Sequence, residues 1–184
     1  PKPSSAASDV YKRQLVYWAG GNPFHHQMNL KKLVKAFKQP DSIIVNEIWW
    51  NSLARHSDII LPANTSIEKN DIGIRHWDQT ISPMQKIIEP IGESKSDYEI
   101  FSEISAKLNF KDKFTENRNE DQWLRYMWEE AKEGAKESGF NLPEFDKFWK
   151  NGFQEVLSPK KQTILLEEFI LSLIHISEPT RRRG

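Results

Sequence analysis

Apolar residues in the first half of the chain alternate between short continuous runs and helical spacing. Runs rich in apolar residues occupy 15–19, 43–45 and 58–62. Between the first two runs, apolar residues recur at helical intervals at Leu30, Leu33, Val34 and Phe37. A strand, helix, strand unit of this kind favours parallel strands joined by a right-handed crossover. We therefore predict an α/β fold with a doubly wound, mostly parallel sheet and flanking helices.

The second half of the chain is predicted to be mainly helical. Ser96 and Asp97 are typical helix-capping residues, and the apolar positions that follow them recur with a period of about 3.6 residues. The same spacing predicts a helix over 121–139 and a shorter one over 143–150, with Gly152 at the C-cap of the latter.

Two segments between these elements lack a regular period. Turn-forming polar residues over 64–73 predict a loop after the third strand. The segment 81–92 contains Pro83 and Pro90 and is predicted to cross in an extended form.

The two ends of the chain have a different origin from the rest. Residues 9–14 back-translate to GATGTGTATAAGAGACAG, and residues 171–176 to the reverse complement of that sequence, as translated sequencing adapters would. We therefore interpret 1–14 and 171–184 as non-native and leave them out of the fold prediction.

The remaining sequence forms one incomplete α/β domain over 15–156, followed by a connecting segment over 157–170. It is mildly acidic, because the excluded ends hold more basic than acidic residues, and this balance argues against a nucleic-acid partner. The chain has no cysteine, which excludes disulfides and cysteine-ligated metals within it. No apolar run reaches the roughly 18 residues that a membrane span needs.

A glycine pair follows the first predicted strand. Gly20 and Gly21 precede Asn22 and Pro23, where a helix is predicted to begin. Glycine lets the backbone approach a ligand closely, and a helix N-terminus favours an anionic group such as a pyrophosphate. A tight turn without a ligand is the alternative. The place of this turn at the end of a parallel strand, where open α/β sheets bind ligands, favours a nucleotide-like ligand.

Polar residues also follow the second predicted strand. Asn46 and Glu47 stand about 20 or more positions after the glycines, where an acidic side chain can accept hydrogen bonds from ribose hydroxyls. Taken alone, Glu47 is more simply interpreted as a solvated carboxylate at a strand end. Together with the glycine pair, it is interpreted as part of a ligand site.

Other polar and aromatic residues allow two interpretations each. Lys69 either pairs with a phosphate or lies in solvent, and Asp97 either caps a helix or accepts the donor edge of a guanine. His25 and His26 either cap a helix or contact a ligand, and no third donor stands at the spacing of a metal site. Three tryptophans either stack on a purine or pterin or pack in a core: Trp49, Trp50 and Trp77.

Four motifs, taken in order, resemble those of the molybdopterin oxidoreductases of the dimethyl sulfoxide reductase family. They are YWAGGNPFHH at 17–26, ARHSDIILPA at 54–63, EKNDI at 68–72 and GESKSDYEIF at 92–101. The similarity runs from 15 to about 156 and is greatest for the branch of trimethylamine-N-oxide, dimethyl sulfoxide and biotin sulfoxide reductases.

The resemblance implies that this chain is an internal part of a catalytic subunit. In that family, molybdenum is held between two molybdopterin guanine dinucleotides, and this domain would bind one of them. Cofactor-binding roles carry over to Gly21, Asn22, His26, Asn46, Glu47, Lys69 and Asp97. No catalytic or metal-ligating residue carries over, because the family's serine ligand and substrate pocket lie outside the matching part.

Two positions depart from the family pattern. Asn46-Glu47 stands where relatives usually carry His-Asp or His-Glu, and Lys69 stands where arginine is usual. Lysine lacks the planar fork of arginine, so a bidentate phosphate contact is not expected at Lys69.

The implied reaction is the two-electron reduction of an N-oxide or an S-oxide during anaerobic respiration, in which the protein binds and orients the cofactor. The relatives imply a periplasmic enzyme with an electron-donating cytochrome, although the biotin sulfoxide reductases are cytoplasmic. We expect the chain alone to be inactive. A hypothesis from another class is a non-catalytic α/β nucleotide-binding or protein-interaction module.

Overall fold

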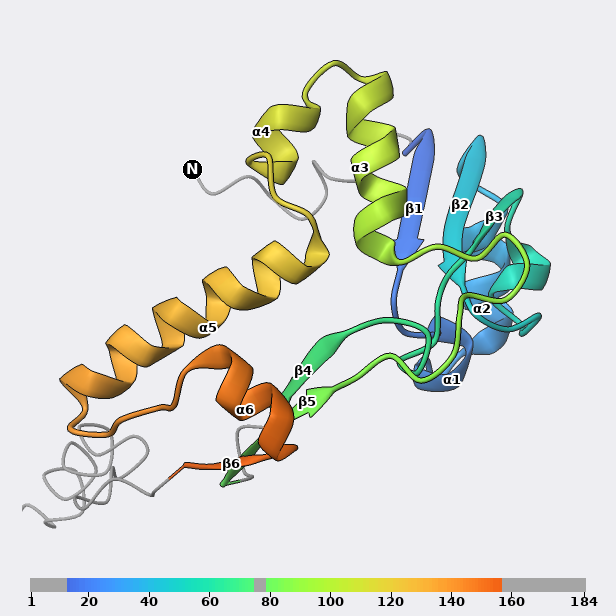
Figure 1. Cartoon of the computed structure of the whole chain (residues 1–184). Coiled ribbons are helices and arrows are strands. Elements are labelled where there is room, and N and C mark those ends of the chain that lie inside the picture. The colour runs from blue at the N-terminus through green and yellow to red at the C-terminus, as the bar shows by residue number, and fades with distance from the viewer. Residues whose placement is uncertain (1–12, 75–78, 157–184) are drawn as a thin grey trace, which may run out of the picture.

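The computed structural model describes residues 13–74 and 79–156 (Figure 1). Three parallel strands form one sheet in the order β1 (Leu15–Ala19), β2 (Ser42–Glu47) and β3 (Ile59–Pro62). Ala19 pairs with Asn46, and Glu47 pairs with Pro62, so the carboxyl ends of all three strands meet at one edge. The predicted parallel sheet is confirmed.

Helices cover both faces of this sheet. The Trp18 ring lies 6.2 Å from that of Phe37 at the end of α2 (Leu30–Phe37). The Tyr17 ring lies 5.3 Å from that of Phe101 in α3 (Asp97–Lys107). Because successive side chains of a strand point to opposite faces, α2 and α3 lie on opposite faces. The sheet is therefore doubly wound, as predicted.

Two short helices follow the carboxyl ends of the strands. The first, α1 (Pro23–His26), comes after β1, and the 3-10 helix η2 (Ala54–His56) comes after β2. They meet where the Phe24 ring stacks on His56 with centroids 4.5 Å apart. The buried β2 residues Ile43 and Val45 form the core of this part of the molecule together with Leu53 and Ala54.

A second sheet is antiparallel and was not predicted. It consists of β4 (Asp71–Ile74), β5 (Thr80–Met84) and β6 (Gln154–Glu155) in that order. The predicted loop over 64–73 therefore ends in a strand, and the predicted extended segment over 81–92 begins in one. These strands are short and contain Gly73 and Pro83, which are depleted in strands, so the sequence pattern did not indicate them.

The helices of the second half are α3, α4 (Lys111–Thr115), α5 (Glu120–Glu137) and α6 (Phe145–Asn151). The last two confirm the predicted helices, with ends shifted by one or two residues. Gly152 ends α6 with a φ of 82°, in the left-handed region that glycine adopts without strain, which confirms the predicted cap.

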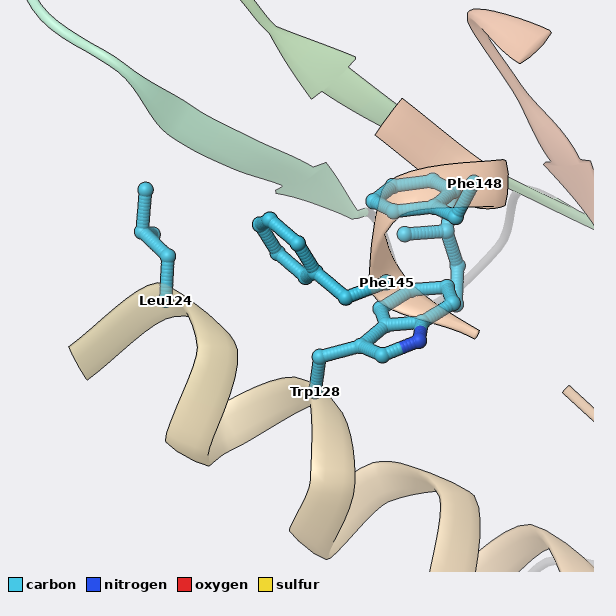
Figure 2. Packing of buried hydrophobic residues seen from close by; sticks show 5 residues of the cluster. Leu124, Trp128, Phe145 and Phe148 are labelled. Carbon is cyan, nitrogen blue, oxygen red and sulfur yellow. The ribbon is translucent and has the colours of Figure 1, made fainter. Parts of the chain in front are cut away.

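The antiparallel sheet and the last two helices share one core, shown in Figure 2. Phe148 of α6 stacks on Trp128 of α5 with centroids 3.8 Å apart and planes at 10°. The Trp128 indole N–H donates to the Pro143 carbonyl at 2.9 Å, which satisfies the one polar atom of that ring. The buried members are Ile81, Leu124, Trp128, Phe145 and Phe148.

Several predictions lie outside the described residues: the connecting segment 157–170, the non-native segment 171–184, residues 1–12 and Trp77. Gln14 is described, and its carbonyl accepts hydrogen bonds from Asp41 N–H and Ser42 N–H. These are backbone contacts that any residue would make, so they do not bear on the predicted non-native origin of 1–14. Over 13–74 and 79–156, no helix combines the length and apolarity of a membrane span.

Candidate functional site

A pocket of about 290 Å³ lies at the carboxyl ends of the three parallel strands. Residues after β1, β2 and β3 line it, together with the first residue of α3. We call it the strand-end pocket; its lining is Gly20, Gly21, Asn22, Asn46, Glu47, Ile48, Asn51, Ala63, Asn64 and Asp97. Five of the seven predicted site residues line it: Gly21, Asn22, Asn46, Glu47 and Asp97.

The glycine pair forms one wall of the pocket in a conformation that requires glycine. Gly20 and Gly21 have φ values of 79° and 70°, in the left-handed region. The Trp18 indole N–H donates to both of their carbonyls, at 3.0 and 3.1 Å, and so holds the turn. A Cβ on either glycine would meet no atom within 4 Å. The backbone at this turn is therefore open to a ligand.

Asn22 links this turn to α1, which is a single turn of helix. The Asn22 carboxamide oxygen accepts from Phe24 N–H at 3.0 Å, and the Asn22 carbonyl accepts from His25 N–H at 3.0 Å. The chain therefore already pairs two of the N–H groups at the helix start. The sequence suggested that the helix N-terminus helps to bind an anionic group, and this contribution is correspondingly small. The glycine backbone and the side chains around it supply most of the polar groups of the pocket.

Asn46 lies at the centre of a hydrogen-bonded chain beneath the pocket. It is 5% exposed, its carboxamide oxygen accepts from the Tyr17 hydroxyl at 2.7 Å, and its Nδ2 donates to Asp97 Oδ1 at 2.7 Å. Both ends of the carboxamide are used, so its orientation is fixed. Burial raises the pKa of Tyr17, the charge of Asp97 raises it further, and the hydrogen bond to Asn46 lowers it.

Asp97 is the first residue of α3 and not its cap. Ser96 is the N-cap, and it forms a capping box with Glu99, in which each side chain accepts from the other residue's backbone N–H. The interpretation of Asp97 as the capping residue is therefore wrong. Because Ser96 performs the capping, the exposed Asp97 carboxylate points into the pocket, where it pairs with Asn46.

Glu47 gives the pocket its second carboxylate. It ends β2, is partly buried, and accepts a hydrogen bond from Ile48 N–H at 3.0 Å. Among the described residues that line the pocket there are two carboxylates and no lysine or arginine. The side chains of the pocket therefore suit a ligand with hydrogen-bond donors, such as a ribose or a guanine edge, better than a phosphate.

Two asparagines in the lining were not singled out from the sequence. Asn51 accepts hydrogen bonds from Leu53 N–H and Ala54 N–H at 2.9 and 3.1 Å and so holds the turn that leads into η2. Asn64 has a buried Oδ1 without a hydrogen-bond partner among the described residues. Buried polar atoms are nearly always paired, so Asn64 Oδ1 is an acceptor that a ligand donor or a water would satisfy. An asparagine following a strand was the available signal for Asn64.

The other two predicted site residues lie outside the pocket. His26 is exposed at the end of α1. The Lys69 ammonium lies 3.4 Å from the Asp71 carboxylate, with 27% of the Lys69 side chain exposed. In the part of the protein described here, neither residue joins the strand-end pocket, and their predicted cofactor contacts stay predictions.

A buried carboxylate that the sequence did not reveal holds the loop beside the pocket. Glu68 is 4% exposed and accepts from Thr65 N–H at 2.7 Å, from the Thr65 hydroxyl at 2.6 Å and from Ile91 N–H at 2.8 Å. The hydrogen bonds from Thr65, followed by that from Ile91, hold the pKa of Glu68 below its usual value. Glu68 thus fixes the loop that carries Asn64 into the pocket.

Trp49 and Trp50 follow the pocket residue Ile48 and are each 67% exposed. The interpretation of these two tryptophans as core residues is wrong, because their indole rings remain largely in solvent. Within the described ranges, no group of three or more His, Cys, Asp or Glu side chains is arranged to hold a metal ion.

The sequence can be compared with those of known families. The family model of the molybdopterin oxidoreductases matches residues 1–107. The chain belongs to this molybdopterin oxidoreductase family. The match begins before the first described residue, and the interpretation of 1–14 as non-native stays a prediction.

Individual members of the molybdopterin oxidoreductase family are similar over most of this chain. It is 41% identical over 140 residues to a biotin sulfoxide reductase of Cereibacter sphaeroides, covering 76% of this chain and 19% of that protein. It is 42% identical over 136 residues to a trimethylamine-N-oxide reductase of Haemophilus influenzae, covering 73% and 16%. The chain thus spans less than a fifth of the length of these relatives.

A solved structure shows the same fold. The acetylene hydratase of Pelobacter acetylenicus superposes on 78% of this chain and 18% of its own with a TM-score of 0.56, at 13% sequence identity. At this identity the likeness supports the fold alone. The molybdopterin oxidoreductase family implies a molybdopterin cofactor bearing molybdenum, as the resemblance of the sequence motifs also implied.

Proposed function

We propose that this chain is part of a molybdenum-dependent N-oxide or S-oxide reductase, and that the strand-end pocket binds the nucleoside end of one molybdopterin guanine dinucleotide. The observation that carries the proposal is the convergence of five predicted residues, from two strand ends and one helix start, on a single pocket. The names of the relatives support the class of substrate.

The residues present fit this group. The unpaired Asn64 Oδ1 and the carboxylates of Glu47 and Asp97 are acceptors, whereas a guanine presents N–H donors and a ribose presents hydroxyl donors. We assign the ribose hydroxyls to Glu47, at the end of the second strand, and the guanine edge to Asp97. The diphosphate would lie against the open backbone of Gly20 and Gly21, where no Cβ projects.

The chemistry that the group supplies when bound is oxygen-atom transfer at molybdenum coupled to two-electron reduction. The described residues bind and orient the nucleotide end. Asn46 positions the Asp97 carboxylate through the 2.7 Å hydrogen bond, and Tyr17 positions Asn46 in turn.

Cofactor analysis of the full-length protein tests this assignment. We expect Asp97→Ala and Glu47→Ala each to lower the guanosine monophosphate released on acid hydrolysis, per mole of polypeptide. Loss of a hydrogen bond to a charged group costs about 1.5–3 kcal/mol, or roughly ten- to a hundredfold in affinity. The exposed Asp146, which pairs with Arg125 on α5, provides the control variant Asp146→Ala. Full guanosine content in both pocket variants would refute the assignment.

The proposed location and electron donor rest on the resemblance to the N-oxide and S-oxide reductases. We propose a periplasmic enzyme of anaerobic respiration that receives electrons from a cytochrome. Cell fractionation, and reduction of trimethylamine N-oxide and dimethyl sulfoxide by the purified full-length protein, would test these points.

A further inference from the structure

The turn formed by the glycine pair depends on the Trp18 side chain for its conformation. The indole N–H donates to the Gly20 carbonyl at 3.0 Å and to the Gly21 carbonyl at 3.1 Å. Among the described residues, no other hydrogen bond to either glycine is present. Packing does not hold the turn either, since a Cβ at each glycine would meet no atom within 4 Å. Because glycine adopts positive and negative φ about equally readily, the turn would change conformation easily without Trp18.

Trp18 draws these two carbonyls toward the face of the parallel sheet that α2 covers. Its ring lies 6.2 Å from that of Phe37 in α2. Tyr17, the neighbouring residue of β1, points to the opposite face, where its hydroxyl donates to the pocket residue Asn46 at 2.7 Å. The two glycine carbonyls are therefore turned away from the side on which Asn46 meets Asp97.

Each of these carbonyls shares a peptide unit with the N–H of the next residue. In a trans peptide the C=O and N–H bonds point in opposite directions, and the described chain has no cis peptide bond. The Gly21 N–H and the Asn22 N–H are therefore directed to the pocket side, and both residues line the pocket. Neither N–H donates to another described residue. Two successive N–H groups left unpaired in a turn suit an anion, and they precede α1.

We propose that Trp18 is a positioning residue for the diphosphate of the bound dinucleotide. By holding two carbonyls toward α2, its indole N–H keeps the Gly21 and Asn22 N–H groups directed at the phosphate oxygens. This inference rests on the proposed function of the strand-end pocket. It also accounts for a described lining without lysine or arginine. The backbone binds the anionic part of the ligand, whereas Glu47 and Asp97 accept hydrogen bonds from the nucleoside.

Aromatic contacts fix the indole in the place from which it holds the turn. The Phe37 ring, which contacts Trp18, also contacts that of Phe24 at 5.1 Å. Phe24 belongs to α1, directly after the turn, so the three rings join β1, α2 and α1 around it. The indole N–H is the one polar group of these three side chains. Its removal would leave the apolar contacts of the ring in place.

The variant Trp18→benzothienylalanine tests the proposal, because this amino acid keeps the shape of tryptophan and lacks the ring N–H. The full-length protein, purified from cells that do not make the cofactor, is titrated with guanosine diphosphate and with guanosine. We expect the variant to bind guanosine diphosphate about tenfold more weakly, as the loss of a hydrogen bond to a charged group would cause. Its affinity for guanosine should stay within about twofold of that of the unmodified protein, because guanosine carries no phosphate.

The same replacement at Trp123 is the matched control and should change neither affinity. The Trp123 indole N–H also donates one hydrogen bond, to the Tyr98 hydroxyl at 3.2 Å, and Trp123 does not line the pocket. Equal losses of affinity for both compounds in the Trp18 variant would show a structural role alone and overturn the inference. An unchanged affinity for guanosine diphosphate would overturn it as well. If the unmodified protein binds neither compound, the proposed function of the pocket is wrong, and the role of Trp18 falls with it.

Discussion

Asn46 Nδ2 donates a hydrogen bond to Asp97 Oδ1 at 2.7 Å, and this bond joins the end of β2 to the start of α3 across 51 positions of sequence. It also connects the two halves of the strand-end pocket, because both residues line it. The pair is anchored below by Tyr17, whose hydroxyl donates to the other end of the Asn46 carboxamide. The geometry of the pocket therefore depends on an interior amide that a cofactor need not touch.

Replacement of Asn46 by aspartate should disrupt this junction. The variant Asn46→Asp loses the donor to Asp97 and brings two carboxylates together, at an expected cost of about 1–3 kcal/mol. The control Tyr17→Phe removes only the hydroxyl and leaves the Asn46–Asp97 bond, at about 1 kcal/mol. Amide exchange over 96–100 in the full-length protein should rise more in Asn46→Asp than in Tyr17→Phe. Equal effects would mean that the bond to Asp97 contributes little.

The same substitution at two glycines should have opposite effects on stability. Gly21→Ala forces a Cβ into the left-handed region at φ 70°, which costs roughly 1–2 kcal/mol although no atom lies within 4 Å. Gly134→Ala, within α5 and equally free of neighbours, should stabilise by about 0.5–1 kcal/mol. Thermal unfolding of both variants checks the signs. Destabilisation by Gly134→Ala would show that helix propensity does not govern that site.

The position of the strand-end pocket could be predicted because it follows from the topology of the parallel sheet. The apolar runs indicated parallel strands, and parallel strands bring the residues after their carboxyl ends together, so Gly21, Asn22, Asn46 and Glu47 converge as expected. Asp97 joins them because Ser96 caps α3, which leaves the Asp97 carboxylate available to pair with Asn46 in the pocket. Local signals and one rule of sheet topology were sufficient for the residues at the strand ends, whereas the local signal at Asp97 also gave the wrong interpretation of a helix cap.

The remaining features depend on contacts between distant segments. β6 pairs with β5 from more than 70 positions away, since Ile81 pairs with Gln154, and neither strand is long enough to show alternation. Glutamate is usually a surface residue. Glu68 is buried because the tertiary fold brings the Ile91 N–H to its carboxylate. A single sequence does not encode such pairings in its local pattern.

Glu68 should make the stability of the pocket loop depend on pH. Its folded pKa lies below the ordinary 4.5, so the stabilisation by the carboxylate is fully present above about pH 4.5 and is lost as the pH falls through the folded pKa. The variant Glu68→Gln should therefore speed exchange of the Ile91 amide at pH 7, and the difference from the unmodified protein should vanish in acid. Glu130→Gln, on the exposed face of α5, is the matched control. It should change neither the exchange rate of the Ile91 amide nor the dependence of that rate on pH. If the difference in Ile91 amide exchange between Glu68→Gln and the unmodified protein persists in acid, it arises from packing and not from charge.

The stacked pair Phe148 and Trp128 should dominate the stability of the part built on the antiparallel sheet. Phe148 is fully buried against Trp128 at 3.8 Å, so Phe148→Ala removes both apolar burial and the ring contact and should cost about 3–5 kcal/mol. Phe153→Ala, five positions later and 56% exposed, removes the same atoms from a site that solvent already reaches, and should cost less than about 1 kcal/mol. Denaturant unfolding followed by tryptophan fluorescence compares the two, and Trp128 contributes to that signal together with the other tryptophans of the chain. Comparable losses in both variants would show that burial of the ring in this core does not control its stability.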